Sequence, residues 1–216
     1  MQETTAREQI LKKIRSANME KFENTYSNVD LNSNIYPPIT DDLDIIFAQE
    51  LNQLDGHFVY CADKEEFLEN INRLFEANKL TKVHIKDHSI TKLLKDSKVQ
   101  IVENEERSEN IVLSVTRCEA LVARLGSVLI SSKQESGRGL NFIPDIHVVI
   151  ANRAQIVETV KEALLLMNSK YEDSLPSMTT LISGPSRTAD IEKTLVLGAH
   201  GPRKLIVFLT EEDILI

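Results

Sequence analysis

The positions of apolar and polar residues along the chain predict short buried strands that alternate with amphipathic helices. Apolar residues recur at helical spacing in four segments, which begin at Thr5, after Thr40, at Asp63 and at Asn152. Shorter helices are expected from Ser89 to Leu94 and in the segment that ends near Gly198. The pattern therefore predicts helices that are distributed from the N-terminal to the C-terminal part of the chain.

Three of the expected helix starts carry capping signals. Thr5 precedes Glu8 by three residues, and Asp63 precedes Glu66 by the same interval. A third start is bracketed by Asn152 and Gln155 at the same spacing. Its helix is expected to carry a continuous apolar stripe over three turns, on Ile156, Val157, Val160, Ala163, Leu164 and Met167.

Short apolar runs between these helices predict the strands of a buried sheet. They cover residues 57–62, 82–86, 98–103, 111–116, 127–132, 146–151, 179–183 and 204–209. Such alternation is typical of an α/β domain with a mainly parallel sheet and helices on both faces. We expect residues 40–216 to form this domain. Residues 1–39 are expected to form an N-terminal helix and an extended arm, because 21–40 are polar and contain two prolines.

Composition and charge exclude several classes of protein. The 216 residues are 42% hydrophobic, with a formal net charge of −8, which is ordinary for a soluble globular protein. An acidic chain without a basic tract is not expected to bind nucleic acid or an anionic membrane. With no apolar run long enough for membrane insertion and no signal-like start, we expect a cytoplasmic protein. Cys61 and Cys118 are interpreted as reduced core thiols.

The segment 182–205 is the strongest candidate for a binding site. It is expected to run from a strand through Gly184 into a helix, which would leave free backbone N–H groups at the edge of the sheet. Ser186, Arg187 and Thr188 would add two hydroxyls and a guanidinium, which suit a phosphate or a carboxylate. The same residues could instead cap the helix, with Arg187 paired to Asp190.

Other histidines and carboxylates give weaker signals. His200 and Arg203 lie in a Gly-rich turn beside that segment, where His200 could be a base or a ligand residue. His147 lies inside an apolar strand and is expected to be a core histidine. Spacing suited to a metal ligand set is absent, so no metal and no cofactor are predicted.

Glu119 is a further candidate because it follows an apolar strand. A carboxylate there could act as a base or a nucleophile, although pairing with Arg124 or exposure to solvent is the simpler interpretation. Residues 132–139 form a flexible stretch that could be a lid or a turn. No catalytic constellation can be recognised, so the catalytic residues and the question of enzymatic activity stay open.

Several segments together resemble the LUD-domain family. The tail SGPSRTADIEKTLVLGAHGPRKLIVFL is similar to the family's C-terminal signature. Upstream, IPDIHVVIANRAQIVETVKEAL resembles its Pro-x-x-His-Val-Val strand and following helix, and CEALVARLGSVLIS occupies the place of its Ala-Asp-x-x-Ile-Ala-Glu-Thr-Gly-Thr segment. The resemblance covers roughly residues 114–210. Arg124 and Leu125 replace the family's Glu-Thr, so a catalytic role for that glutamate does not carry over, whereas Glu119 falls on the family's aspartate.

The resemblance implies a fold similar to the NagB/RpiA/CoA-transferase group and a role in oxidising lactate to pyruvate. It implies partner subunits, one of them rich in iron-sulfur clusters, and an accessory or anion-binding component here, because this chain lacks the cysteines for a cluster. Homo-oligomers are possible. The ligand residues it favours are Gly184, Ser186, Arg187, Thr188, His200, Arg203 and Glu119. Fold similarity alone also allows a stand-alone enzyme or sensor for a sugar phosphate or a CoA thioester.

Overall fold

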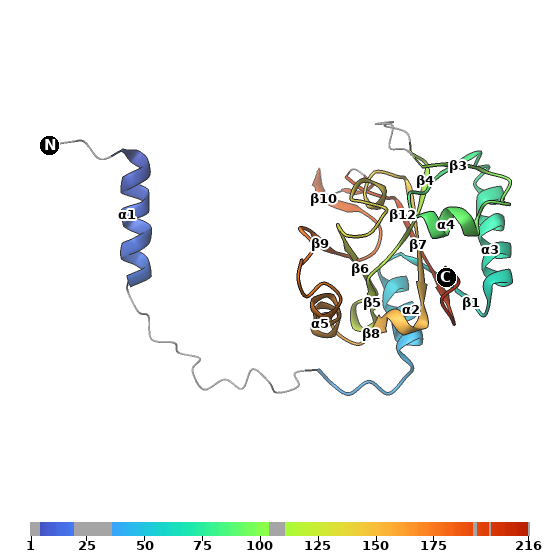
Figure 1. Cartoon of the computed structure of the whole chain (residues 1–216), viewed down its shortest axis with the longest axis horizontal. Helices are drawn as coiled ribbons and strands as arrows, with labels where there is room; N and C mark the ends of the chain where they lie inside the picture. Colours follow the sequence, from blue (N-terminus) through green and yellow to red (C-terminus); the bar gives the residue numbers. More distant parts are fainter. Residues whose placement is uncertain (1–4, 20–35, 104–110, 192–193, 199, 216) are drawn as a thin grey trace. The chain divides into compact units, whose positions relative to one another are not determined.

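The computed structural model describes residues 5–19, 36–103, 111–191, 194–198 and 200–215 (Figure 1). The chain divides into two units, Met1–Ile39 and Thr40–Ile216. In the first unit, α1 (Ala6–Met19) begins with the predicted capping box: Thr5 N donates to Glu8 Oε2 at 2.9 Å, and Glu8 N donates to Thr5 Oγ1 at 3.4 Å. Most of the expected arm, 20–35, and the polar run 104–110 lie outside the described residues.

The second unit is built on a six-stranded parallel sheet, which confirms the predicted fold class. Its strands are, in spatial order, β1 (His57–Cys61), β12 (Lys204–Thr210), β7 (Ile146–Asn152), β4 (Leu113–Arg117), β2 (Lys82–His84) and β3 (Gln100–Val102). Every neighbouring pair is parallel. All six carboxyl ends therefore lie at one edge of the sheet.

Both faces of this sheet are covered. On one face, α3 (Lys64–Ala77) and α4 (His88–Leu93) pack Phe67 and Ile90 into a core that includes Val148. On the other face, α2 (Leu43–Gln53) packs against Val149. Alternate residues of β7 thus enter opposite cores, which is why five of its seven residues are apolar.

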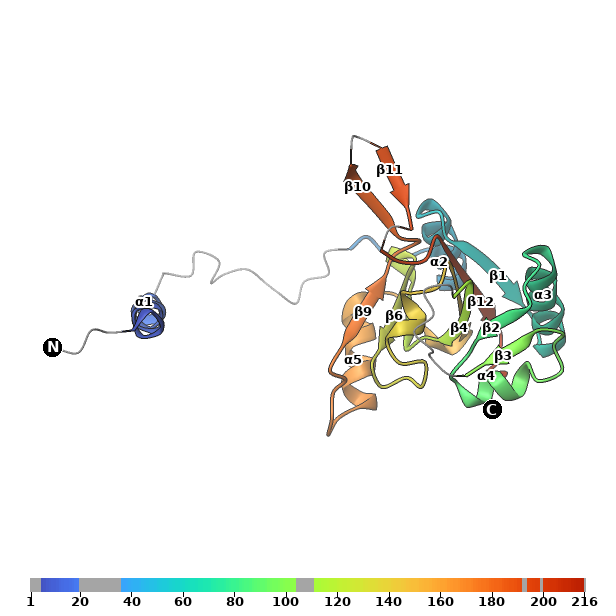
Figure 2. The same cartoon turned by 90° about the horizontal axis from the view of Figure 1, so that it is seen from above.

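A smaller sheet completes the second face. It contains β8 (Ile156–Val157), β5 (Ala120–Val122), β6 (Ser127–Ser131) and β9 (Thr179–Ile182), in that order. Leu121 belongs to the core shared with the parallel sheet, whereas Ala120 and Val122 pack with α5 (Val160–Lys170). Figure 2 shows α5 and the small sheet on one side of the parallel sheet and α3 and α4 on the other. Short 3-10 turns cover Ala123–Leu125, Gly139–Asn141 and Arg153–Gln155.

The helix expected from Asn152 starts later than the sequence predicts. Asn152 and Gln155 do form a capping box, but it encloses a 3-10 turn. Ile156 and Val157 then form β8, which pairs in parallel with β5. β-Branched residues favour strands, and here a partner strand is available. Thr159 Oγ1 accepts a hydrogen bond from Glu162 N at 3.3 Å and begins α5.

The prediction of a helix that ends near Gly198 is wrong. This segment forms an antiparallel hairpin, β10 (Arg187–Ile191) and β11 (Thr194–Leu197), in which Thr188 pairs with Val196 and Ile191 with Thr194. All four of these residues are β-branched, so strand propensity overrides the glycine turn and the capping hydroxyls that suggested a helix start. Strand β5 is also missing from the predicted strands, because three residues are too short an apolar run to indicate a strand.

Candidate functional site

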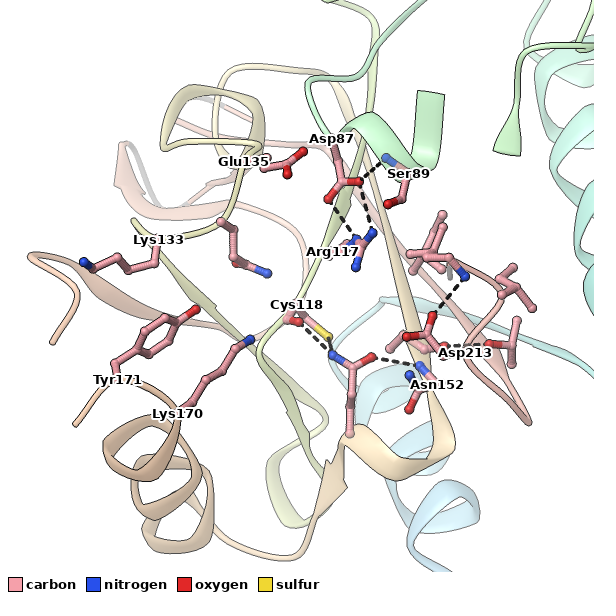
Figure 3. Close-up of a pocket in the computed structure, with 17 residues that line it drawn as sticks. Asp87, Ser89, Arg117, Cys118, Lys133, Glu135, Asn152, Lys170, Tyr171 and Asp213 are labelled. Carbon is pink, nitrogen blue, oxygen red and sulfur yellow. Dashed lines mark hydrogen bonds and ion pairs between the residues drawn. The ribbon is translucent and has the colours of Figure 1, made fainter. Parts of the chain in front are cut away.

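A half-open cleft of about 550 Å³ lies at the carboxyl edge of the parallel sheet (Figure 3). The ends of β4, β7 and β12, three adjacent strands, supply part of its wall. Ligands of open α/β sheets bind outside the carboxyl ends of the strands. The lining residues are Asp87, Ser89, Arg117, Cys118, Lys133, Gln134, Glu135, Ile150, Ala151, Asn152, Gln155, Lys170, Tyr171, Thr210, Asp213, Ile214 and Leu215.

The cleft includes the point where the strand order reverses. After β2 the chain moves outward to β3, whereas after β4 it moves in the opposite direction to β7 and then β12. The two connections also leave on opposite faces of the sheet, through α4 and through the small sheet. Asp87 follows β2 and Arg117 ends β4, so these two residues lie on either side of this switch point.

Asp87 and Arg117 form a two-contact ion pair at this point. Arg117 Nε lies 2.8 Å from Asp87 Oδ2, and Arg117 Nη2 donates to Asp87 Oδ1 at 3.2 Å. Asp87 also caps α4, because its Oδ1 accepts from the backbone N–H groups of Ser89 and Ile90 at 3.0 and 3.1 Å. The carboxylate is nearly buried and the guanidinium is partly exposed, with side-chain exposures of 8% and 32%.

On the opposite wall, a buried carboxylate holds two residues from the end of α5. Glu119 Oε2 accepts a hydrogen bond from Lys170 Nζ at 2.8 Å, and Glu119 Oε1 accepts from Tyr171 Oη at 2.9 Å and from Ser131 Oγ at 2.6 Å. The Glu119 side chain is only 2% exposed, whereas that of Lys170 is 60% exposed. Glu119 therefore lies behind the wall and presents Lys170 and Tyr171 to the cleft.

These contacts fix the protonation states at the wall. Burial lowers the pKa of Lys170, but the hydrogen bond to Glu119 and its negative charge act the other way, and the pKa is raised overall. Burial and the same carboxylate raise the pKa of Tyr171. At neutral pH, Lys170 is an ammonium ion and Tyr171 is a neutral phenol.

Gln155 fixes the base of the cleft. Its Oε1 accepts from Asn152 N at 3.0 Å, and its Nε2 donates to the carbonyl oxygen of Cys118 at 2.8 Å. The end of β7 is thereby joined to the residue that follows β4. Burial raises the pKa of the Cys118 thiol to about 12, so this sulfur is a neutral wall atom and not a nucleophile.

Residues 132–139, the stretch expected to be a lid or a turn, contribute Lys133, Gln134 and Glu135 to the cleft lining. Glu135 Oε2 accepts from His88 N, the first residue of α4, at 2.8 Å. Lys133 Nζ donates to Ser174 Oγ, beyond α5, at 3.0 Å. Residues 132–139 therefore connect the two sides of the cleft.

The predicted binding residues of the tail do not line this cleft. Arg187 Nη2 donates to Asp55 Oδ2 at 2.7 Å and also to the carbonyl oxygen of Leu54, at the end of α2. Gly184 has a φ of +77°, and a Cβ atom there would come within 2.6 Å of that same carbonyl oxygen. Both residues thus attach the start of the hairpin to α2. The helix start that favoured an anion site is absent from this described segment.

The remaining tail residues shape the base of the hairpin. Ser186 N donates to the carbonyl oxygen of Pro202 at 2.8 Å, and Gly198 N donates to that of Ser186 at 3.0 Å. Arg203 Nε lies 3.6 Å from Asp145 Oδ1, and His200 is exposed. For Thr188 the structure gives only its backbone pairing. The candidate residues of this segment therefore lie around the hairpin. Glu119, the remaining candidate, belongs to the wall of the cleft instead.

Glu119 does not pair with Arg124, contrary to expectation, and it does not face solvent. Arg124 Nε donates to Glu158 Oε1 at 2.9 Å. Glu119 is nevertheless the one predicted site residue that supports the cleft. Asp87, Arg117, Lys170 and Tyr171 were missed, and the one local signal was the position of Arg117 directly after the apolar run of β4.

Two predictions about buried groups are confirmed. Cys61 and Cys118 are buried free thiols. His147 is fully buried, with Nε2 at 2.8 Å from Thr116 Oγ1, and desolvation lowers its pKa to about 3. In the described part of the chain, no three His, Cys, Asp or Glu side chains gather to hold a metal ion. None of the described helices is both long and apolar enough to cross a bilayer.

Comparisons with known proteins identify relatives of this chain. The LUD domain family model matches residues 46–210. Lactate utilization protein C of Bacillus licheniformis is 33% identical over 112 residues, which are 51% of this chain and 47% of that protein. Its namesake from Bacillus subtilis is 31% identical over 112 residues, again 51% and 47%. The chain spans about half the length of these curated relatives.

A solved structure supports the fold. A DUF162 family protein from Deinococcus radiodurans matches with a TM-score of 0.57 at 19% identity. The match covers 80% of this chain and 99% of that one. At this identity the likeness establishes a shared fold.

Proposed function

The chain belongs to the LUD domain family, and on that premise we propose that it acts in lactate utilization as a component without its own redox centre. The family match over residues 46–210, together with relatives named lactate utilization protein C, carries this proposal. Oxidation of lactate to pyruvate removes two electrons, so the complete system needs an electron carrier.

We assign that carrier to a partner subunit with iron-sulfur clusters. Such clusters are usually held by four Cys thiolates, whereas this chain has two cysteines and both are buried free thiols. The role left to this chain is that of an accessory component in the cytoplasm, where thiols stay reduced.

The accessory component has a ligand of its own, an anion bound in the cleft at the edge of the sheet. Arg117 and Lys170 supply the positive charge, and their partners Asp87 and Glu119 are nearly buried. We place the ligand here and not at the hairpin, because Arg187 already contacts Asp55 and Leu54.

Deletion of the gene and growth on lactate as sole carbon source test this function. We expect the deletion strain to lose growth on lactate, to keep growth on pyruvate, and to be restored by the full chain. Affinity purification of the tagged chain from lactate-grown cells should recover a cysteine-rich iron-sulfur protein. Normal growth of the deletion strain on lactate would contradict the proposal.

A further inference from the structure

We propose that the cleft binds a dianion longer than lactate, with one acidic group on Arg117 and the other on Lys170. The inference rests on the proposed function in that it concerns the same anion site. It names the ligand's chemical class: a molecule whose two carboxylate or phosphate-like groups lie at opposite ends of a short chain.

The Arg117 wall has free donors that suit a carboxylate. A guanidinium has five N–H donors. Asp87 engages the Nε and Nη2 side of Arg117, at 2.8 and 3.2 Å. The Nη1 edge stays available for a second, fork-like contact. Asp87 is held in place by two backbone N–H groups of α4, so a ligand need not displace it.

The Lys170 wall has the same construction. Lys170 Nζ donates to Glu119 Oε2 at 2.8 Å, which leaves two of its three N–H donors. Glu119 accepts two further hydrogen bonds, from Ser131 and Tyr171, and stays behind the wall. Its side chain is 2% exposed against 60% for Lys170, so the ligand meets the cation first.

Figure 3 shows Arg117 and Lys170 extending toward the middle of the cleft from opposite sides. The other charged side chains of the lining have partners. Lys133 Nζ donates to Ser174 Oγ at 3.0 Å, Glu135 accepts from His88 N at 2.8 Å, and Asp213 accepts from Leu215 N at 2.9 Å. The N–H donors that Arg117 and Lys170 keep beyond those used by their carboxylate partners are thus the main recognition feature.

The size of the cleft argues against lactate as its complete ligand. A volume of about 550 Å³ corresponds to roughly 18 water molecules, at about 30 Å³ each in the liquid. Lactate has only six non-hydrogen atoms and one carboxylate, so it leaves most of that space empty and contacts one wall.

Isothermal titration of the full chain with matched acids tests the proposal. The first arm compares the linear dicarboxylates from malonate to adipate with monocarboxylates of the same length. The second arm uses phosphonoacetate and phosphonopropionate. Comparison with the dicarboxylates shows whether the cleft prefers a phosphate-like group or a carboxylate at one end of the ligand. We expect the best-fitting dianion to bind roughly 10- to 150-fold more tightly than its monoanion, the usual range for a charged hydrogen bond.

Lys170→Gln in a Glu119→Gln background is the decisive variant, because the second substitution avoids leaving the buried Glu119 carboxylate without its cation. It should remove the advantage of the dianion and leave monoanion binding through Arg117. Lys161→Gln, which removes an exposed lysine of the same helix, should behave as the parent. Arg117→Gln in an Asp87→Asn background removes the other end without stranding a buried carboxylate.

Equal affinity for dianions and monoanions overturns the inference, as does a dianion advantage that survives Lys170→Gln. Absence of binding by all of these acids at millimolar concentration overturns it too. None of these outcomes affects growth on lactate, which tests the proposed function separately. Conversely, tight dianion binding in a protein whose deletion leaves growth on lactate intact contradicts the function and supports the ligand class.

Discussion

Arg187 is joined to Asp55 by a contact of 2.7 Å that attaches the C-terminal hairpin to the end of α2. The two residues are 132 positions apart in the chain. The same guanidinium donates to the carbonyl oxygen of Leu54. A residue that the sequence assigned to an anion site thus satisfies a helix end and an aspartate of its own chain.

Arg187→Ala should lower the free energy of unfolding by about 1 kcal/mol or less, because the pair is solvent-exposed. Binding of anions in the cleft should stay unchanged. Urea unfolding and a ligand titration on the same protein measure both quantities. Asp55→Asn, which removes the same pair from the other side, should give a similar small loss. A selective loss of anion binding in Arg187→Ala alone would return the ligand to the hairpin.

The fold was largely predictable because apolar periodicity marks most of its buried elements. Five of the seven residues of β7 are apolar since both of its faces are covered, and Asp63 begins α3 by accepting from Glu66 N at 2.8 Å. The sequence predicts a helix in place of the hairpin β10–β11, because the turn at Gly184 and the hydroxyls of Ser186 and Thr188 are typical of a helix start. Local helix signals of this kind are overridden when a partner strand is available for pairing.

The cleft was less predictable because its contacts join distant positions. Asp87 and Arg117 are 30 residues apart, and Glu119 and Lys170 are 51 apart. A single sequence contains no record of which carboxylate meets which cation. The sequence shows only that polar residues follow apolar runs. This signal applies to Glu119 and also to Arg117, which is not among the site residues predicted from the sequence.

Gly184→Ala should destabilise the protein through a steric conflict. Its φ is +77°, and the added Cβ would approach Leu54 O to 2.6 Å. Gly137 offers a matched control, since its φ is +63° and nothing lies within 4 Å of the same position. We expect Gly137→Ala to lose about 1 kcal/mol from the left-handed backbone alone. Gly184→Ala should lose distinctly more in urea unfolding, and equal losses would contradict the close contact.

Glu119→Gln should weaken the wall that supports Lys170. The substitution keeps the shape but removes the charge that three donors share, so we expect a loss of about 1 to 3 kcal/mol in unfolding free energy. Glu158→Gln is the matched control, because Glu158 pairs with Arg124 near the surface, at 33% side-chain exposure. Its loss should be smaller, about 0.5 kcal/mol. Thermal or urea unfolding that ranks the two variants in the opposite order would argue against a supporting role for Glu119.

The two thiols should resist thiol–disulfide exchange in the native protein. Burial raises the pKa of Cys118 to about 12 and also raises the pKa of Cys61. A disulfide reagent at pH 8 should react slowly with folded protein and quickly with both cysteines in urea, because the thiolate is the reactive form. The absorbance of the released thiol gives the stoichiometry. Rapid reaction of one equivalent in the folded protein would show an accessible thiol.

Stability should fall as the pH is lowered below about 6.5, in part because of His147. Desolvation lowers its pKa to about 3 in the folded protein. Between those two values the unfolded chain binds one more proton at this site than the folded chain, so acid favours unfolding. Below pH 3 both states are protonated and this dependence ends.

His147→Gln should remove this contribution and flatten the pH dependence. From pH 6 to pH 5 the unfolding free energy of the parent should drop by about 1 kcal/mol more than that of the variant. Thr116→Ser keeps both the histidine and the hydroxyl that lies 2.8 Å from its Nε2, so it should retain the parent's slope. Urea unfolding at pH 7, 6 and 5 measures all three proteins. Parallel profiles for the parent and His147→Gln would mean that His147 does not gain a proton when the protein unfolds.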